Sequence, residues 1–241
     1  MTLSETASNL IHYCMEIFFP IACLNCGKQE NYLCVVCISD IPTTPPACFG
    51  CGKLSPPRKR THPGRTCTQC QKKTNIYAYY SPYVFTSKPI RQAIAALKYR
   101  RMRPVADLLG TLISRYLIAH GVRFPQNSVL IPIPLHPKRH RSRGFNQSEQ
   151  IAKILSKNKK IPLEIRILQK KHHTVPQVGL AAIERRQNII NTFIILASTN
   201  IQGKTVILVD DVKTTGATME EAARVLKNAG ARRIYAVTAA H

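Results

Sequence analysis

Four Cys-x-x-Cys pairs fall within the first 70 residues and account for eight of the nine cysteines. A tetrahedral zinc site needs four thiolates about 2.3 Å from the metal, and two such turns facing each other supply them. Glycine follows the second cysteine in CLNCG and CFGCG, where it allows a left-handed turn that brings backbone amides close to the sulfurs. We therefore expect two structural zinc sites with the following ligands: Cys23, Cys26, Cys34, Cys37, Cys48, Cys51, Cys67 and Cys70.

The sequence leaves the pairing of these turns open. In a sequential arrangement the first two pairs hold one zinc and the last two hold the other, whereas a cross-braced arrangement joins the first pair to the third. A disulfide framework is the alternative use of the cysteines, but the crowding of Cys-x-x-Cys and the absence of a secretory signal pattern favour zinc. Four thiolates leave no open coordination position, which indicates a structural metal. Metal binding would also supply folding free energy to a segment with few core residues.

The first 24 residues carry neither a basic secretory region nor a membrane span. Glu5 and Glu16 make this start acidic, and the apolar residues 17–24 fall far short of the roughly 20 residues that cross a bilayer. We expect a soluble cytoplasmic protein without a transmembrane segment, in which Cys14 is a small buried hydrophobe. Residues 17–19 belong either to a helix packed on the core or to a peripheral contact with a membrane or a partner.

The chain is strongly basic, with a formal net charge of +23 and a pI near 10.0. Such a charge indicates a polyanionic partner, which is nucleic acid, a phosphorylated ligand or an anionic membrane surface. The excess is concentrated in residues 81–200, which hold 21 basic and 4 acidic residues. The alternatives for such runs are a solvated face and a track for backbone phosphates. Residues 55–64, basic and rich in proline, are open to the same two interpretations.

From residue 76 onward the pattern changes to alternating strands and helices. Residues 76–85 predict a strand whose four tyrosines either pack in a sheet or stack on bases. Residues 89–121 predict two helices joined by a basic cluster, and residues 129–131 predict a buried strand that ends at two prolines. A basic loop over residues 138–143 and a helix opening at residues 146–148 follow, an order that places anions beside a helix N-terminus. Residues 163–168 and 191–196 predict further strands, with a short helix around Arg185 and Arg186 between them.

The last 39 residues predict a strand–helix–strand unit with a phosphate-binding loop. We expect strands at residues 206–209 and 234–238, and a helix at residues 219–229 with Gly230 as its C-cap. In the loop 213–218 every residue after Lys213 is small or carries a hydroxyl, and the loop precedes a helix N-terminus that offers backbone N–H groups to a phosphate. Asp210 and Asp211, at the strand end, can accept hydrogen bonds from sugar hydroxyls or reach Mg²⁺ through water. Neither a Walker A loop nor a GxGxxG fingerprint is present.

Branched residues, two adjacent acids and x-x-Thr-Thr-Gly-x-Thr resemble the phosphoribosyl pyrophosphate (PRPP) motif of type I phosphoribosyltransferases. PIPLHPKRHRSRGFNQ, TVPQVGL with ERRQN, and the cysteine-rich start together resemble the ComF family of competence proteins, which includes GntX-like relatives. The resemblance covers almost the whole chain. It implies an α/β fold: a type I phosphoribosyltransferase-like domain over residues 75–241, with a mostly parallel sheet flanked by helices. A small N-terminal region over residues 1–74 would hold a helix and the zinc ribbons.

The resemblance also implies a binding site for PRPP and Mg²⁺. Asp210 and Asp211 would bind the ribose hydroxyls, and residues 174–177 would belong to a mobile loop over the site. His172 and His173 stand where the family often has a basic residue. The residues expected to hold the 5′-phosphate are Lys213, Thr214, Thr215, Gly216, Ala217 and Thr218. The residues expected near the pyrophosphate are Lys138, Arg139 and Arg143.

Two classes of function follow and stay open. The resemblance implies a role in natural transformation, handling incoming single-stranded DNA on the cytoplasmic side, with other DNA-uptake proteins and at the inner face of the membrane. The alternative is an active phosphoribosyltransferase, in which Mg²⁺ stabilises the departing pyrophosphate and an unidentified nucleobase or amine accepts the ribose. The surplus of central cations favours a DNA track. Its candidate residues are Lys98, Arg100, Arg101, Arg103 and Arg141.

Overall fold

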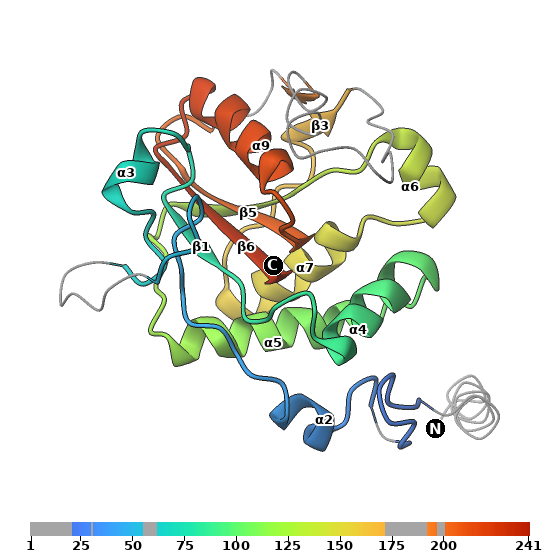
Figure 1. The fold of residues 1–241 in the computed structure, drawn as a ribbon. Coiled ribbons are helices and arrows are strands. Elements are labelled where there is room, and N and C mark those ends of the chain that lie inside the picture. The colour runs from blue at the N-terminus through green and yellow to red at the C-terminus, as the bar shows by residue number, and fades with distance from the viewer. Residues whose placement is uncertain (1–20, 30, 55–61, 172–191, 197–200) are drawn as a thin grey trace, which may run out of the picture.

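A four-stranded parallel sheet in the order β1-β6-β5-β2 forms the centre of the protein (Figure 1). The computed structural model describes residues 21–29, 31–54, 62–171, 192–196 and 201–241. The strands are β1 (Ala78–Tyr80), β2 (Ser128–Pro132), β5 (Thr205–Val212) and β6 (Arg233–Ala240). In register, Val206 of β5 lies between Val129 of β2 and Ile234 of β6. The near-continuous apolar runs of β5 and β6 fit a parallel sheet that is covered on both faces.

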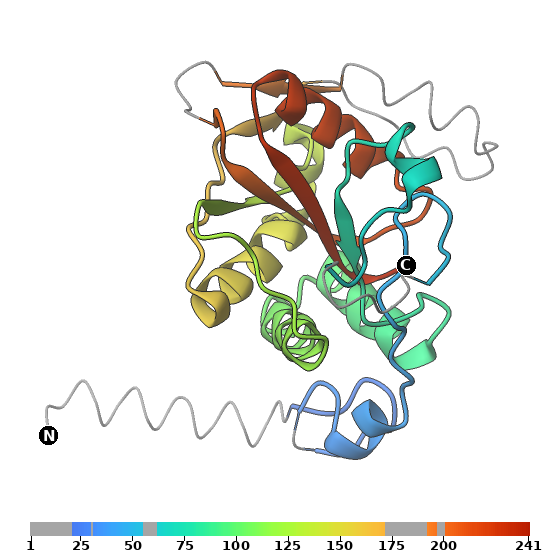
Figure 2. The ribbon, with the colours of Figure 1, turned by 90° about the vertical axis from the view of Figure 1, so that its left-hand side faces the viewer.

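Alternate residues of β5 enter two separate hydrophobic cores. Ile207 and Val209 pack with helices α4 (Lys88–Tyr99), α5 (Val105–Ala119) and α7 (Gln147–Lys159) on one face. Val206 and Leu208 pack with α9 (Ala217–Asn228) on the other face. Figures 1 and 2 show this division, with α4, α5 and α7 on one side of the sheet and α9 on the other. The period-two alternation of a strand therefore sets which helix covers which face.

The two cysteine ribbons pack on opposite faces of the sheet. The first contains α2 (Val35–Ser39), and its Leu33 and Ile41 are buried in the same core as α4 and α5. The second contains α3 (Thr68–Gln71), and its Phe49 is buried in the core beneath α9. Figure 1 accordingly shows α2 below α4 and α5, and α3 near β1 and α9. The domain boundary at residue 74 stays a prediction.

Several predicted elements are confirmed at nearly their expected positions. The two helices of residues 89–121 are α4 and α5, and β2, β5 and β6 contain the three buried strands. The predicted strand at 191–196 is β4 (Phe193–Ile195). Asn146 caps α7, because its side chain accepts a hydrogen bond from the backbone N–H of Ser148. Helix α9 ends one residue earlier than expected, with Ala229 as its C-cap and Gly230 next at φ +93°.

Three local predictions are wrong. The expected basic loop at 138–143 is a helix, α6 (Pro137–Arg143), since Pro137 begins it and Gly144 ends it at φ +79°. The strand expected at 163–168 is replaced by one parallel bridge at Leu163 and by β3 (Leu168–Lys170), which pairs antiparallel with β4. The long strand expected at 76–85 is interrupted. It forms β1 and, beyond Pro82, which has no N–H to donate to a ladder, a single parallel bridge between Tyr83 and Ala240.

The tyrosines of this segment serve mainly in packing. Tyr79, Tyr80 and Tyr83 are buried, and the ring of Tyr80 stacks on that of Tyr235 with centroids 6.4 Å apart. The predicted N-terminal helix, Cys14, the basic loop from residue 55 to 61, the helix around Arg185 and the loop at 174–177 lie outside the described residues. Within the described part of the chain, none of the helices combines the length and the hydropathy needed to span a bilayer.

The close approach of α5 and α7 gives a first prediction. A Cβ at Gly110 would lie 2.6 Å from Cβ of Ile154. We expect Gly110→Ala to lower the free energy of unfolding, because overpacking of about 1–3 kcal/mol exceeds the ~1 kcal/mol gained in helix propensity. Urea unfolding measures the change. Combining Gly110→Ala with Ile154→Gly, which removes the facing Cβ, is expected to cost less than the sum of the two single changes, and strict additivity would contradict the contact.

Candidate functional site

The acid pair and the predicted phosphate loop meet at the carboxyl edge of the sheet. Asp210 and Asp211 lie near the C-terminal end of β5, and residues 213–216 lead from that strand into α9. Because β2 and β5 are parallel, the segment that follows β2, including α6, starts at the same edge. Ligands of open parallel sheets bind at this edge. The structure therefore brings the acids, the loop and the basic helix to one side of the molecule.

Asp210 is held by hydrogen bonds from two directions. Its Oδ1 accepts from Oγ of Ser148, at 2.7 Å, and from the backbone N–H of Asp211, at 2.9 Å. Burial of the carboxylate and the neighbouring charge of Asp211 raise the pKa of Asp210 to about 6. Ser148 was not among the site residues predicted from the sequence. Its position in the first turn of the predicted helix was the signal that could have found it. A carboxyl group with this pKa changes between its neutral and ionised forms close to neutral pH.

Asp211 forms an ion pair with a residue that we had expected to contact DNA. Nζ of Lys98, from the last turn of α4, lies 2.8 Å from Oδ1 of Asp211. The side chains are 21% and 8% exposed respectively, so the pair is largely shielded from solvent. Lys98 therefore compensates one of the two acidic charges at the strand end. The side chain of Lys98 thus lies beside the acid pair and not on the outer surface.

The loop is open at its centre and anchored at its start. Thr214 and Thr215 are exposed, and Gly216 caps α9 in the left-handed conformation at φ +79°. The first turn of a helix leaves backbone N–H groups without intrahelical partners, and here they face this loop. Ala217 and Thr218, which form the start of α9, are half-buried. These features suit an anion more than a cation.

Lys213, which the resemblance assigns to the 5′-phosphate, lies against two aromatic rings. Its Nζ lies 5.1 Å from the ring centroid of Phe49 and 5.4 Å from that of Tyr79. Burial lowers the pKa of Lys213 below its usual range. This cation–aromatic contact holds the side chain at the base of the loop. Phe49 was not predicted as a site residue from the sequence, where it is one of the two residues between the cysteines of a Cys-x-x-Cys pair.

Helix α6 supplies further cations at this side of the molecule. Arg143 donates to Oε1 of Gln147 at 3.0 Å, and Lys138 is exposed. Burial and the charge of Arg143 lower the pKa of Arg139. Lys170 of β3 lies close enough for its pKa to be lowered by burial and by Arg139, and raised in part by Asp210. Lys170 is thus a further cation near the predicted pyrophosphate position.

The connection between α4 and α5 is fastened to α6 and forms one surface with it. Nη2 of Arg101 donates to the carbonyl of Ser142 at 2.8 Å, and Nη2 of Arg103 donates to that of Gly144 at 3.1 Å. Tyr99, 74% exposed, has the guanidinium of Arg143 5.7 Å from its ring centroid. We call the following set the α4–α6 basic surface: Tyr99, Arg100, Arg101, Arg103, Lys138, His140, Arg141 and Arg143.

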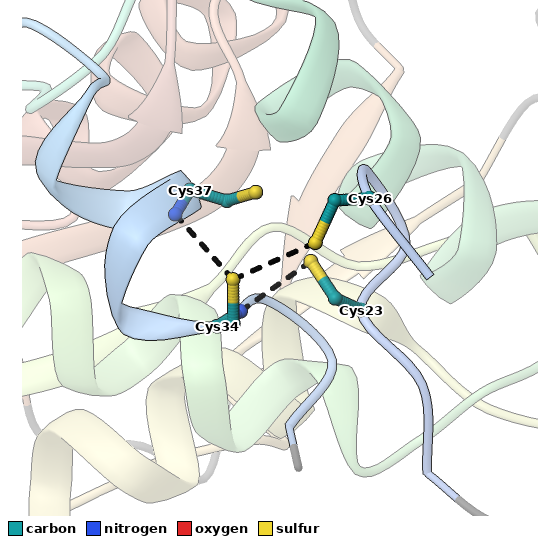
Figure 3. Close-up of side chains that lie close together, drawn as sticks. All are labelled: Cys23, Cys26, Cys34 and Cys37. Atoms are coloured by element: carbon teal, nitrogen blue, oxygen red, sulfur yellow. Dashed lines mark hydrogen bonds between the residues drawn. The ribbon is translucent and has the colours of Figure 1, made fainter. Parts of the chain in front are cut away.

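The first cysteine cluster joins the first two Cys-x-x-Cys pairs (Figure 3). The four sulfurs lie within 4.8 Å of one another, and Sγ of Cys26 is 3.7 Å from Sγ of Cys34. A tetrahedron with bonds of about 2.3 Å has sulfurs roughly 3.8 Å apart, so the donor set fits zinc. The backbone N–H of Cys34 donates to Sγ of Cys23 at 3.4 Å, and that of Cys37 donates to Sγ of Cys34 at 3.5 Å. Burial raises the pKa of the Cys23 thiol, but hydrogen bonds from backbone N–H groups outweigh this effect and lower the pKa to about 6.

The second cluster repeats this arrangement with the last two pairs. Sγ of Cys51 and Cys67 are 3.9 Å apart, and the backbone N–H of Cys67 donates to Sγ of Cys48 at 3.3 Å. Burial raises the pKa of Cys48, while backbone N–H groups lower it to about 7. Gly27 and Gly52 both have positive φ, of +78° and +70°, after equivalent cysteines. The cysteines are therefore grouped sequentially and not cross-braced.

Comparison with known proteins identifies the family. Competence protein F of Haemophilus influenzae is 30% identical over 229 residues, which are 91% of this chain and 96% of that protein. The chain belongs to the ComF family. The DNA utilization protein YhgH of Escherichia coli K12 is 28% identical over 83% of this chain and 86% of its own length. Competence protein ComFC of Bacillus subtilis is 26% identical over 69% of this chain and 73% of that protein.

The phosphoribosyltransferase part of this ComF protein is recognised separately. The family model described as a phosphoribosyl transferase domain matches residues 141–241, which run from the end of α6 through β6. A solved glutamine PRPP amidotransferase of B. subtilis, complexed with ADP and GMP, covers 56% of this chain and 26% of its own, with 18% identity and a TM-score of 0.39. The parallel sheet with helices on both faces agrees with that domain type. The family-model match, the observed sheet and the cysteine clusters together confirm the predicted fold class.

The sequential grouping predicts how zinc is lost from variants. We expect two zinc ions per chain, measured by elemental analysis of the purified protein. Replacing Cys23 and Cys34 together by Ser should leave one zinc, because both belong to one cluster, whereas replacing Cys23 and Cys48 should leave none. A cross-braced arrangement gives the opposite pair of results.

The raised pKa of Asp210 predicts that replacing this carboxyl group by a neutral amide stabilises the fold at neutral pH but not at acid pH. Folding disfavours the ionised carboxylate, so the destabilisation is absent below the ordinary pKa of 3.8 and complete above about 6. Asp210→Asn, which can still accept from Ser148, should therefore raise the melting temperature at pH 7.5 and lose that gain as the pH falls to 4. The exposed Glu164→Gln serves as the control and should show no such trend. An equal gain at both pH values would contradict the assignment.

Proposed function

We propose that this ComF protein acts in DNA uptake, binding single-stranded DNA on the α4–α6 basic surface and PRPP with Mg²⁺ at the carboxyl edge of β5. The observation that carries the proposal is the adjacency of the two sites. Lys98 at the end of α4 pairs with Asp211, and the next residues along the chain belong to the exposed basic surface. The names of the relatives, a competence protein and a DNA utilization protein, support the biological setting.

Single-stranded DNA suits the α4–α6 basic surface better than a small phosphorylated ligand does. Its cations extend over two segments that hydrogen bonds hold together, so they can follow several successive phosphates. Tyr99 adds an exposed aromatic ring, and bases stack on such rings with little preference for sequence. A pocket for one PRPP molecule uses only a few cations, which leaves most of this surface for a longer polyanion.

The pocket proposal uses the acid pair, the loop and α6. Asp210 would accept hydrogen bonds from the ribose hydroxyls, and the exposed Thr214 and Thr215 with the adjacent backbone would hold the 5′-phosphate. Lys138, Arg139 and Arg143 would lie near the pyrophosphate. Mg²⁺ would neutralise the pyrophosphate charge when bound. We also propose that the protein works on the cytoplasmic side, at the inner face of the membrane and with other DNA-uptake proteins.

The intact acid pair and hydroxyl loop also favour a second candidate, an active phosphoribosyltransferase. In that reaction the bond between the ribose C1 and pyrophosphate breaks, and an acceptor nucleobase or amine forms a bond to C1. The cations of α6 would stabilise the charge on the departing pyrophosphate. Pyrophosphate release from PRPP, screened across acceptors with and without single-stranded DNA, separates this activity from binding alone.

The DNA proposal predicts steep salt dependence that maps to one surface. Each phosphate contact contributes about 0.7 to the slope of log K against log salt for single strands. Changing Arg100, Lys138 and Arg141 together to Gln should reduce that slope by about 2, measured by fluorescence anisotropy with an oligo-dT probe. The matched control changes Arg123, Lys157 and Lys160, exposed cations near the other edge of the sheet, to Gln. Equal losses in both variants would argue for diffuse attraction and against a defined surface.

The pocket proposal predicts ligand stabilisation. PRPP with Mg²⁺ at 100 times its dissociation constant should stabilise the fold by about 2.7 kcal/mol and raise the melting temperature. Replacing Asp210 and Asp211 together by Ala should abolish that rise while leaving oligo-dT binding in place. A wild-type protein whose melting temperature does not respond to PRPP would refute the pocket.

A further inference from the structure

We infer that the second cysteine ribbon positions the phosphate loop, and that Phe49 is the positioning residue. Phe49 lies between Cys48 and Cys51 and is buried in the core beneath α9. The ligand side of this inference rests on the proposed PRPP site. The contact between ribbon and loop stands on the structure alone.

Phe49 forms the support beneath the turn of the loop. A Cβ added at Gly216 would lie 2.8 Å from Cζ of Phe49, which shows that the ring leaves space only for glycine. Gly216 also adopts φ +79°, which other residues rarely adopt. The conformation of the residue that opens α9 therefore depends on where the Phe49 ring lies.

The start of the loop rests on the same ring. Phe49 packs edge-on against Tyr79 of β1, with centroids 5.5 Å apart and planes at 82°. Nζ of Lys213 lies 5.1 Å from the Phe49 centroid. Lys213 and Gly216 bracket the exposed Thr214 and Thr215, so one side chain of the ribbon contacts both ends of the proposed phosphate cradle.

A second contact holds the helix behind the loop. Three residues after Cys70 the chain turns, and the backbone N–H and side-chain Nδ2 of Asn75 both donate to Oε1 of Glu220 at 2.8 Å. The hydroxyl of Thr74 donates to the other oxygen, Oε2. Glu220 is in the first turn of α9, where its charge is favoured by the helix dipole. The second ribbon and the residues directly after it therefore contact both the loop and α9.

The first ribbon provides an internal comparison. Leu24 occupies the position equivalent to Phe49, directly after the first cysteine of its cluster. It packs against the core of α4, α5 and α7, on the opposite face of the sheet from α9. The cysteines of each cluster fix the turn that carries Leu24 or Phe49. Among the described residues, the second metal site is therefore linked to the loop through Phe49, and the first is not linked through Leu24. By reciprocity, a ligand on the loop should also tighten the second site alone.

Matched cysteine variants of the full-length protein test this link. Cys26 and Cys51 are equivalent and both exposed, and Cys26→Ser or Cys51→Ser should each lower zinc content from two ions to one. Cys51→Ser is expected to speed amide hydrogen exchange in residues 213–218 and to weaken ribose 5-phosphate binding about tenfold. Cys26→Ser should leave both at wild-type values. Equal effects of the two variants would overturn the inference.

Substitutions at Phe49 separate positioning from metal binding. Phe49→Ala should keep two zinc ions yet speed loop exchange and weaken ribose 5-phosphate binding, whereas Leu24→Ala should change neither. Phe49→Leu should speed loop exchange and weaken ribose 5-phosphate binding less than Phe49→Ala does. Phe49→Tyr should not show this partial recovery, because the added tyrosine hydroxyl extends from Cζ toward Gly216. Wild-type loop exchange in Phe49→Ala would overturn the inference. If the wild-type protein fails to bind ribose 5-phosphate, the proposed ligand is wrong, but the exchange measurement still decides the positioning role.

Discussion

Strand β5 is the element on which the rest of the structure depends. It is paired on both sides, with β2 and β6, and its alternate residues are buried in two cores. A strand held in this way cannot shift by one residue without moving each core side chain to the wrong face. The fixed register places Asp210 and Asp211 at the strand end and sets where the loop enters α9. The register of β5 therefore fixes where the candidate site lies in the fold.

The charges around this strand end are organised by two elements distant in sequence. Helix α4 brings Lys98 to Asp211, and α6 brings its arginines to the carboxyl edge beside β2. Of the cations near this strand end, Lys98 is held in a shielded ion pair with the acids, and others form an exposed surface beside it. This division would allow one region to serve both proposed roles, the binding of a small ligand and of a longer polyanion.

Local patterns predicted the elements well where local physics decides them. The apolar period of α4 and α5, the cap at Asn146 and the branched run of β5 depend on neighbours within a turn or along one strand. The pattern failed at α6, where charge suggested a loop although Pro137 and Gly144 marked a short helix. It also failed at residues 163–168, because β3 is defined by its antiparallel partner β4 and not by its own composition.

By itself, the sequence determined the donor set for two metal sites, the acid pair with its hydroxyl loop, and the concentration of charge in the centre of the chain. Tertiary structure alone decided the sequential grouping of the cysteines, the pairing of Lys98 with Asp211 and the support of Gly216 by Phe49. The ion pair and the contact of Phe49 with Gly216 join residues distant in sequence, which the register of the sheet and the packing of its two faces bring together. No local pattern encodes these two contacts, because their energy exists only after both cores have formed. The cysteine grouping depends on how each ribbon turns back on itself, which the Cys-x-x-Cys spacing does not specify.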